Sequence, residues 1–260
     1  DSGAYGVRDG MLCSLGSLDA PAPLVRVGEM RLAYGDTGAG LYVSNGKSVW
    51  RVVGEQIEEL AREGTYDKAQ IVDGTDVYDA PPPSRFMSWA FGRLWCANEF
   101  GVFYSQPYKP DQFDLESDFI PLENVTGFGF TDTGLFIGTL TDVYYLSGGN
   151  PKQPMATSRV STAGCADGSM INVSADDYAV EAQGKAVAWE STKGKALGVN
   201  GGGVQFITKQ VHYDIDGMAA SFIRNKGGQK QHISTFRGDG SGMAASDHAE
   251  AQIIRNGQPI

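Results

Sequence analysis

Histidine, the side chain that most often acts in acid–base catalysis, occurs only three times in this sequence. His212, His232 and His248 all lie in the last 50 positions. In a Ser–His–Asp triad a histidine base activates the serine nucleophile, and in one large class of hydrolases the serine lies in a G-x-S-x-G turn, which the sequence lacks. His212 and His232 lie in alternating, strand-like runs, where we expect a surface or half-buried ring rather than a base. His248 has acidic neighbours, but a solvated turn is the simpler interpretation.

Four aspartates are candidates for glycoside hydrolysis, a reaction that needs two carboxylates facing one cleft. They are Asp132, Asp142, Asp176 and Asp177. No spacing pairs two of them, and the S-x-D-x-G-x-x-W boxes of sialidase-type propellers are missing. We therefore predict no catalytic residue and no enzymatic activity.

Metal and cofactor motifs are equally weak. Asp73-Gly74-Thr75-Asp76 lacks the remaining ligands of an EF-hand loop, and Gly127-Phe128-Gly129 lacks the third glycine of a dinucleotide-binding turn. Cys13, Cys96 and Cys165 are widely spaced and form no cluster with histidine, so we expect neither zinc nor a disulfide framework. We expect Cys96 to be a buried thiol, and we predict no metal and no cofactor.

The net negative charge of the chain disfavours general binding to polyanions such as nucleic acid. The sequence has 21 Lys and Arg against 31 Asp and Glu, a net charge of −10, which gives no general attraction to nucleic acid or anionic membranes. The longest uncharged stretch, 196–208, has 13 residues and is too short to span a bilayer. The sequence begins with Asp1, so we expect a processed chain or a piece of a longer one.

One local basic group departs from this balance. It comprises Arg224, Lys226, Lys230 and Arg237, and it could face nucleic acid or an acidic neighbouring subunit. A solvated hairpin face is the simpler interpretation. We interpret the adjoining tripeptide Arg237-Gly238-Asp239, an integrin-type sequence, as a coincidence.

The elements that position these residues are predicted to be strands. Glycine is 35 of 260 residues, about twice its usual share of about 7%, and short β-branched and aromatic runs alternate with turn residues. The predicted strands are 41–43, 48–52, 85–97, 101–105, 128–130, 135–137, 143–146, 178–181, 186–189, 204–208 and 232–237. One helix is predicted over Glu55–Glu63, because Ile57, Leu60 and Ala61 would share a face. We expect 80–84 to be a stiff connector and 198–203 a hairpin turn.

An internal repeat points to the fold. Three copies place a leucine eight residues before a valine that precedes aromatics: Leu41 and Val49, Leu94 and Val102, Leu135 and Val143. A looser fourth copy starts at Val187. The four copies begin at residues 41, 94, 135 and 187. Their separations of 53, 41 and 52 residues approximate the roughly 40–50 residues of a four-stranded propeller blade. We predict an all-β fold, a β-propeller-like array of four to six antiparallel blades, or a partial ring, over residues 1–213, with each copy as the inner hairpin of a blade.

The C-terminal residues 214–260 show a second repeat. Gly217–Ser221 recurs as Gly242–Ser246, which predicts a pair of related β-hairpins that form an extension or a part of the same domain. Chance similarity among small residues is the alternative.

Aromatic residues fall regularly on the repeats. We expect them to form the core between sheets, and sugar-binding platforms are the alternative. They are Trp50, Phe86, Trp89, Phe91, Trp95, Phe103, Tyr104, Phe136, Tyr144, Tyr145 and Trp189.

The segment 84–97, SRFMSWAFGRLWCA, continues through GVFYSQP at 101–107 to Phe113-Asp114. It resembles propeller-type structural proteins of tailed bacteriophages, such as tail-hub or DNA-stabilisation proteins, tail nozzles and tail accessory proteins. Residues 134–148 and 186–208 look like the next blades, and the resemblance covers about residues 31–213. The chain is shorter than these proteins, and its C-terminal hairpins lie outside the pattern.

The resemblance implies a non-enzymatic role in the virion, in a ring at the tail or the head–tail connection that retains or conducts packaged DNA. The implied partners are copies of itself and neighbouring tail or head–tail proteins, with DNA only passing through the lumen and no membrane. Assembly would take place in the host cytoplasm. The alternatives are a carbohydrate-recognising propeller, either a receptor-binding tail part or a lectin, and a propeller glycoside hydrolase.

Overall fold

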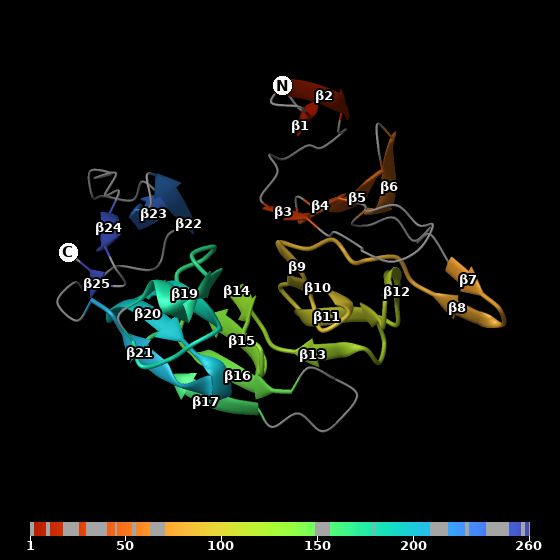
Figure 1. Cartoon of the computed structure of the whole chain (residues 1–260). Helices are drawn as coiled ribbons and strands as arrows, with labels where there is room; N and C mark the ends of the chain where they lie inside the picture. The colour runs from red at the N-terminus through yellow and green to blue at the C-terminus, as the bar shows by residue number, and fades with distance from the viewer. Residues whose placement is uncertain are drawn as a thin grey trace. The chain divides into compact units, whose positions relative to one another are not determined.

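The computed structural model describes residues 3–8, 11–17, 26–29, 41–44, 46–53, 56–62, 71–148, 157–178, 180–208, 218–226, 229–237, 250–255 and 258–259. These residues form antiparallel sheets and two short 3₁₀ turns, Ala175–Asp177 and Asn200–Gly202, and contain no α-helix. The all-β prediction is confirmed. The chain divides into two compact units, Asp1–Leu122 and Glu123–Ile260 (Figure 1). The expected boundary between 213 and 214 falls outside the described residues.

Unit 1 contains four sheets, each joined in sequence order. They are β1 (Gly3–Arg8) with β2 (Met11–Ser17); β3 (Arg26–Glu29), β4 (Leu41–Ser44), β5 (Ser48–Val53) and β6 (Gln56–Arg62); β7 (Ile71–Asp73) with β8 (Asp76–Tyr78); and β9 (Phe86–Ala90), β10 (Arg93–Asn98), β11 (Gly101–Gln106) and β12 (Lys109–Phe113), with β13 (Phe119–Pro121) also paired to β11. The expected connector 80–84 contains no regular element up to the turn before β9.

Unit 2 contains three four-stranded meanders. They are β14 (Val125–Phe130), β15 (Gly134–Thr139), β16 (Val143–Ser147) and β17 (Thr157–Ser161); β18 (Ile171–Ser174), β19 (Lys185–Ser191), β20 (Gly194–Gly198) and β21 (Val204–Phe206); and β22 (Met218–Lys226), β23 (Gln229–Arg237), β24 (Glu250–Arg255) and β25 (Gln258–Pro259). The expected turn 198–203 connects β20 to β21. The first predicted C-terminal hairpin is confirmed as β22–β23, whereas residues 242–246 lie outside the described part.

The repeats found in the sequence are the two central strands of their sheets. They form the hairpins β4–β5, β10–β11, β15–β16 and β19–β20. Their registers place Trp95 opposite Tyr104 and Phe136 opposite Tyr145. Each repeat is therefore the inner pair of an antiparallel meander, as the spacing predicts.

The predicted helix over Glu55–Glu63 is wrong, because Gln56–Arg62 is strand β6. β6 pairs with β5, with a register shift between Val49 and Trp50, and Leu60 is buried. An isolated helix of this length is marginal in water, whereas the edge of β5 supplies a ladder of backbone hydrogen bonds. This non-local pairing prevails over the helical spacing.

Two strand predictions also need correction. The run 85–97 is not one strand but the hairpin β9–β10, because Phe91 and Gly92 both adopt positive φ, 51° and 69°, and reverse the chain. No strand covers the described residues of 178–181. Tyr178 instead follows the 3₁₀ turn Ala175–Asp177, and its side chain is buried.

The aromatic side chains of the repeats form the cores. In unit 1 the sheets β3–β6 and β9–β13 enclose Tyr42, Val49, Leu94 and Phe103, among others. Eight of the eleven predicted core aromatics are buried, whereas Trp89, Phe91 and Tyr144 are half-buried. The core prediction is thus largely confirmed.

In unit 2 the sheets β14–β17 and β18–β21 pack around Phe136, Tyr145, Trp189 and Met170. Gly198 permits their close approach, because a Cβ at this position would lie 2.7 Å from Cζ of Phe136.

Candidate functional site

A buried polar cluster is the most distinctive group of titratable residues in the described part of the chain. Glu190 on β19 and Lys195 on β20 are paired residues of one hairpin, with Nζ and Oε1 3.1 Å apart. Both side chains are fully buried, with 0% and 1% exposure. Trp189 points to the other face of the sheet, towards β14–β17. Alternation along the strand therefore places the ion pair on the opposite face.

Strand β23 covers this ion pair. Its alternate residues His232 and Ser234 are fully buried. The Ser234 hydroxyl donates a hydrogen bond of 2.6 Å to Glu190 Oε1, and Ser221 on β22 contacts the same hydroxyl at 2.9 Å. The β22–β23 hairpin is thus bonded to the sheet β18–β21 by polar groups.

His232 is bonded to Tyr178, which follows the 3₁₀ turn Ala175–Asp177. Its Nδ1 lies 2.9 Å from the hydroxyl of Tyr178. Burial, together with the nearby Lys195 ammonium, lowers the pKa of His232 to about 3, so the ring is neutral at physiological pH. Burial raises the pKa of Tyr178, and the carboxylates of Asp177 and Glu190 raise it further.

The expectation that His232 is at the surface or half-buried is wrong. The side chains of His232 and Ser234 lie on the face of β23 that packs against β19 and β20. This face is buried only because strands distant in the sequence come together in the folded chain. A fully buried, neutral ring bonded to Tyr178 has no access to an external substrate while the hairpin is in place. The cluster as folded can join two sheets, and it does not present an open acid–base pair.

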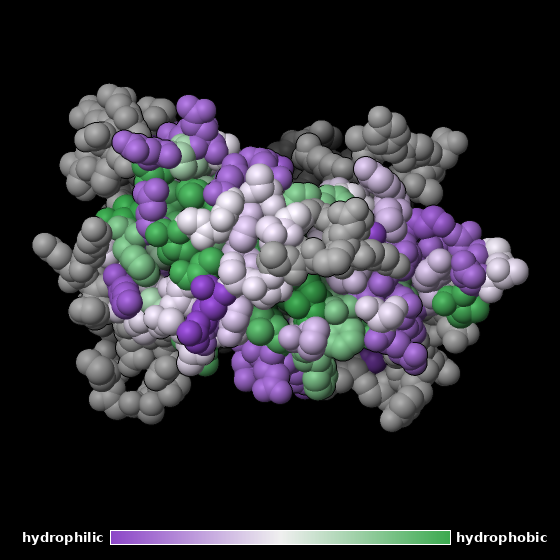
Figure 2. All heavy atoms as spheres, turned by 90° about the horizontal axis from the view of Figure 1, so that it is seen from below, coloured by the Kyte–Doolittle hydropathy of each residue, from purple (hydrophilic) through white to green (hydrophobic). Residues whose placement is uncertain are grey.

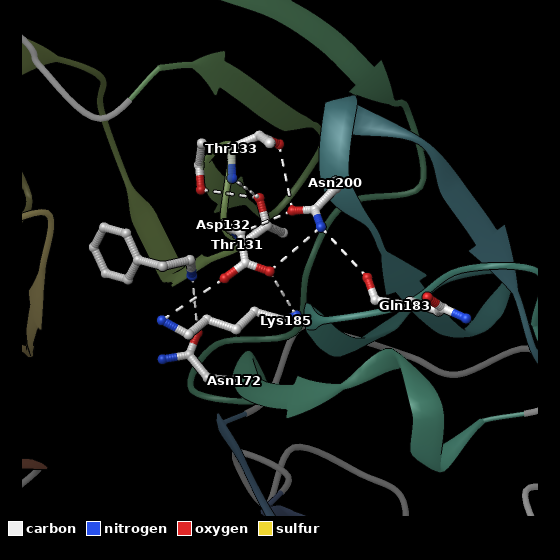
Figure 3. A network of polar contacts seen from close by, with 9 residues as sticks. Thr131, Asp132, Thr133, Asn172, Gln183, Lys185 and Asn200 are labelled. Carbon is white, nitrogen blue, oxygen red and sulfur yellow. Dashed lines mark hydrogen bonds and ion pairs between the residues drawn. The ribbon is translucent and has the colours of Figure 1, made fainter.

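A second polar network lies at the end of unit 2 where three connections meet (Figure 3). Oδ2 of Asp132, in the β14–β15 turn, accepts a hydrogen bond of 2.9 Å from the backbone N–H of Lys185. Oδ1 of Asn200, between β20 and β21, accepts the N–H of Asp132 at 2.9 Å, and its Nδ2 donates to the carbonyl of Gln183 at 3.4 Å. Nearby, the N–H of Phe130 donates to Oδ1 of Asn172 at 2.8 Å. These bonds connect the sheet β14–β17 to the sheet β18–β21.

The carboxylate of Asp132 serves this network as an acceptor. The backbone N–H of Lys185, the Asn200 amide and the Lys185 charge together lower its pKa. The Lys185 ammonium lies 3.9 Å from Oδ1 of Asp132. Asp132 is thus held as a structural anion.

The other predicted carboxylates are distributed elsewhere. Asp142 lies 3.5 Å from Arg159, Asp176 accepts from Ser174, and Asp177 pairs with Lys230. The structure therefore assigns each of the four aspartates different partners and does not assemble them as a hydrolytic pair.

The predicted basic group is divided in the structure. Arg224 and Lys226 are exposed on β22, whereas Lys230 on β23 is half-buried and bonded to Asp177. Arg237 ends β23. His212, His248 and the Gly238-Asp239 part of the tripeptide lie outside the described residues.

The cysteine prediction is confirmed at Cys96, whose thiol is buried and whose pKa is raised by burial. Cys165 is also a buried free thiol. The described residues contain no cluster of His, Cys, Asp and Glu that could hold a metal ion. They also contain no helix long and apolar enough to cross a membrane.

The cluster around Glu190 and Lys195 was not predicted from the sequence. Its one local signal is a pair of charges placed symmetrically about the turn that joins two apolar runs, Ala186–Trp189 and Ala196–Leu197. Charged residues at such positions are ordinarily solvent-exposed, and nothing local identifies the strand that covers them.

Comparison with known proteins identifies no family. No family model matches the sequence, and no curated protein matches it. Among solved structures, the chain is similar to BBS1N from its complex with ARL6DN, with 10% identity, coverage of 89% of this chain and 82% of that chain, and a TM-score of 0.44.

Two further structures are similar at the same level of identity. The extracellular domain of a hybrid two-component system from B. thetaiotaomicron has 10% identity, a TM-score of 0.45 and coverage of 92% of this chain, which spans only 32% of that chain. Kluyveromyces lactis Hsv2 has 10% identity, a TM-score of 0.34 and coverage of 85% and 77% of the two chains. None of these likenesses bears on function.

Proposed function

We propose that the protein is a non-enzymatic structural component of a tailed-bacteriophage virion, in which propeller-like sheets build a ring at the tail or head–tail connection. The observation that carries this proposal is the segment 84–114. Its sequence resembles such proteins, and it folds as the meander β9–β12 with the repeat at its centre. Stacked meanders of this kind are the building principle of propellers.

The use of the charged groups supports a scaffold role. Glu190 and Lys195 form a buried ion pair, and Asp132 belongs to a hydrogen-bond network between two sheets. A catalytic site would require titratable groups that converge on an accessible cleft. Here Glu190, Lys195 and Asp132 hold sheets together, which suits a protein that must resist mechanical load.

The net charge of −10 is compatible with a lumen through which DNA passes. Negative walls repel phosphates, so the DNA would slide rather than bind. The proposed partners are copies of the chain and neighbouring tail or head–tail proteins, with the virion as the final location.

Cryo-electron microscopy of the purified protein, and of particles that copurify with it, tests this proposal. We expect rings of defined symmetry, or density for the chain in a phage tail. A protein that remains monomeric at high concentration and is missing from purified particles would overturn it.

A carbohydrate-recognising role is the second candidate, and the side chain of Tyr108 favours it. This residue is 74% exposed with a φ of 57°. Its ring lies against Gly92, where a Cβ would be 3.0 Å from Cζ of Tyr108. A ring held flat by one face and open on the other is suited to stacking.

A glycan array compares the two functions. If the protein recognises carbohydrate, Tyr108→Ala abolishes a specific glycan signal that Phe100→Ala leaves intact, because Phe100 is similarly exposed at 67% on a different turn. No specific signal from the unmodified protein would leave the assembly role as the better account.

A further inference from the structure

The hairpin β7–β8 projects from unit 1 with an apolar pair on one face. Val72 and Val77 lie directly opposite each other in its register, and they are 67% and 56% exposed. All residues from Val72 to Val77 are exposed. Figure 2 shows a small hydrophobic spot, coloured green among hydrophilic side chains, on the side of the view where Figure 1 places β7 and β8. A two-stranded hairpin with an uncovered apolar face is marginal by itself.

The base of the hairpin is nevertheless fixed. The backbone groups of Asp79 and Phe113 exchange hydrogen bonds of 2.8 and 2.9 Å, and Ala80 is buried. At the tip Asp73 bonds to Lys109. The hairpin is therefore held in position while its valine face stays open, a combination suited to docking.

Strand β22 of unit 2 carries a complementary surface. It is an edge strand of its sheet, and its alternate residues Ala220, Phe222, Arg224 and Lys226 are exposed. Phe222 is 51% exposed. Among the described residues neither Arg224 nor Lys226 forms an ion pair. This outer face is thus apolar at its centre and basic at one end.

We propose that the β7–β8 hairpin of one copy docks on the outer face of β22 in a second copy, with Val72 and Val77 against Phe222. Contact between these exposed apolar side chains would remove their surface from water, which favours association. The carboxylate of Asp76 at the hairpin tip would face Arg224 or Lys226. This inference rests on the proposed ring assembly and specifies one of its contacts.

Charge selects this pairing over the symmetrical one. Two β7–β8 hairpins placed face to face would bring the Asp76 carboxylate of one copy close to that of the other, whereas Asp73 is paired with Lys109 within its own copy. Two β22 strands would likewise oppose their cations. Opposite charges meet only when the hairpin of one copy contacts β22 of another, and such head-to-tail contacts generate closed rings or filaments.

The contact is small compared with a standard interface, which buries about 800 Å² on each partner. A single pair of copies therefore associates weakly, and closure of a ring supplies the avidity. A test must capture a short-lived contact, for which cross-linking between different copies is suited.

The experiment uses two variants of the full chain in a Cys13→Ser background, Val77→Cys and Phe222→Cys. Each carries one introduced cysteine at an exposed position, while the native Cys96 and Cys165 are buried. They are mixed in equal amounts under mild oxidation. We expect the mixed dimer to form several-fold faster than either homodimer, and the excess to shrink at high salt because exposed charges are screened. Since each chain carries only one of the introduced thiols, the mixed product reports contacts between copies.

A matched control replaces Phe222→Cys with Leu140→Cys, since Leu140 is also exposed, at 42%, and lies in the β15–β16 turn, away from β22. Reversal of charge gives a second control. Arg224→Glu with Lys226→Glu is expected to remove the excess, and Asp76→Lys in the other partner is expected to restore it. Mixed dimers formed no faster than the homodimers or the Leu140 control would overturn the proposed contact.

These outcomes are distinct from failure of the ring assembly itself. Rings that persist in Val72→Asp with Val77→Asp would reject the contact and keep the assembly. Loss of rings in that variant, with rings in the Leu140→Asp control, supports both. A chain without any rings or virion location rejects the assembly.

Discussion

Glu190 and Lys195 face each other across the β19–β20 hairpin, 3.1 Å apart and closed off from solvent by β23. A buried ion pair contributes little net stability, because desolvation offsets attraction, but removal of one member leaves an uncompensated charge. The packing of the β22–β23 hairpin on the sheet β18–β21 should therefore not tolerate replacement of Glu190 or Lys195 alone. This relationship leads directly to a stability experiment.

Replacing one member of the pair is expected to destabilise unit 2 more than replacing both. Lys195→Met or Glu190→Leu alone should lower the free energy of unfolding by about 3–5 kcal/mol. The double variant should recover much of this loss, because no charge remains buried. Native-state amide hydrogen exchange of β19 and β20 at increasing urea concentration measures the difference. A double variant as unstable as the sum of the singles would contradict the account.

The hold of the β22–β23 hairpin is expected to weaken with acid because of His232. Its pKa is about 3 in the folded chain, against about 6.5 in an unfolded one. Below pH 6.5 the unfolded chain takes up a proton that the folded chain does not, so stability falls as pH decreases from 6.5 towards 3. The loss approaches about 1.4 kcal/mol per pH unit within that window.

Hydrogen exchange of residues 229–237 between pH 7 and pH 5 measures this effect, after correction for the intrinsic exchange rate. His232→Gln has no titrating ring and serves as the control, in which the pH dependence should be reduced. Equal pH dependence in the two proteins would show that a group other than His232 makes the stability of the β22–β23 hairpin depend on pH.

The sheets β14–β17 and β18–β21 are expected to tolerate no larger side chain at Gly198, where they pack closely. A Cβ there would lie 2.7 Å from Cζ of Phe136, which is fully buried. Gly198→Ala should therefore cost about 1–3 kcal/mol through overpacking. Phe136→Leu in the same chain should offset part of that cost, although alone it destabilises. Thermal unfolding of the four proteins tests this, and simple additivity would argue against the contact.

The loop network around Asp132 is expected to give a smaller, local effect. Asp132→Ala removes the acceptor of the Lys185 N–H and should cost about 1 kcal/mol, the typical net value of a hydrogen bond. Asp176→Ala is the control, because Asp176 is exposed and its carboxylate accepts a hydrogen bond from the neighbouring Ser174 hydroxyl. Faster exchange of the Lys185 amide in the first variant alone is the predicted result.

Local patterns were sufficient to predict the central hairpins of the meanders. The spacing of Leu94 and Val102, and of Leu135 and Val143, reflects two strands and a tight turn, all within one stretch of chain. Burial of Trp95 and Trp189 follows from the same alternation. These features needed no knowledge of the rest of the molecule.

Features that depend on distant strands were missed or mistaken. Residues 56–62 have a helical spacing, yet the open edge of β5 makes them a strand. The burial of His232, Glu190 and Lys195 depends on how β22–β23 lies on β18–β21, and no local signal encodes that placement. The candidate site was therefore found from the structure.

Cryo-electron microscopy of the purified protein, and of the particles with which it copurifies, tests the central claim most directly. The account predicts rings of defined symmetry, or density for the chain in the tail or head–tail connection of a phage. Uniform monomers at high concentration, together with absence from purified particles, would contradict it.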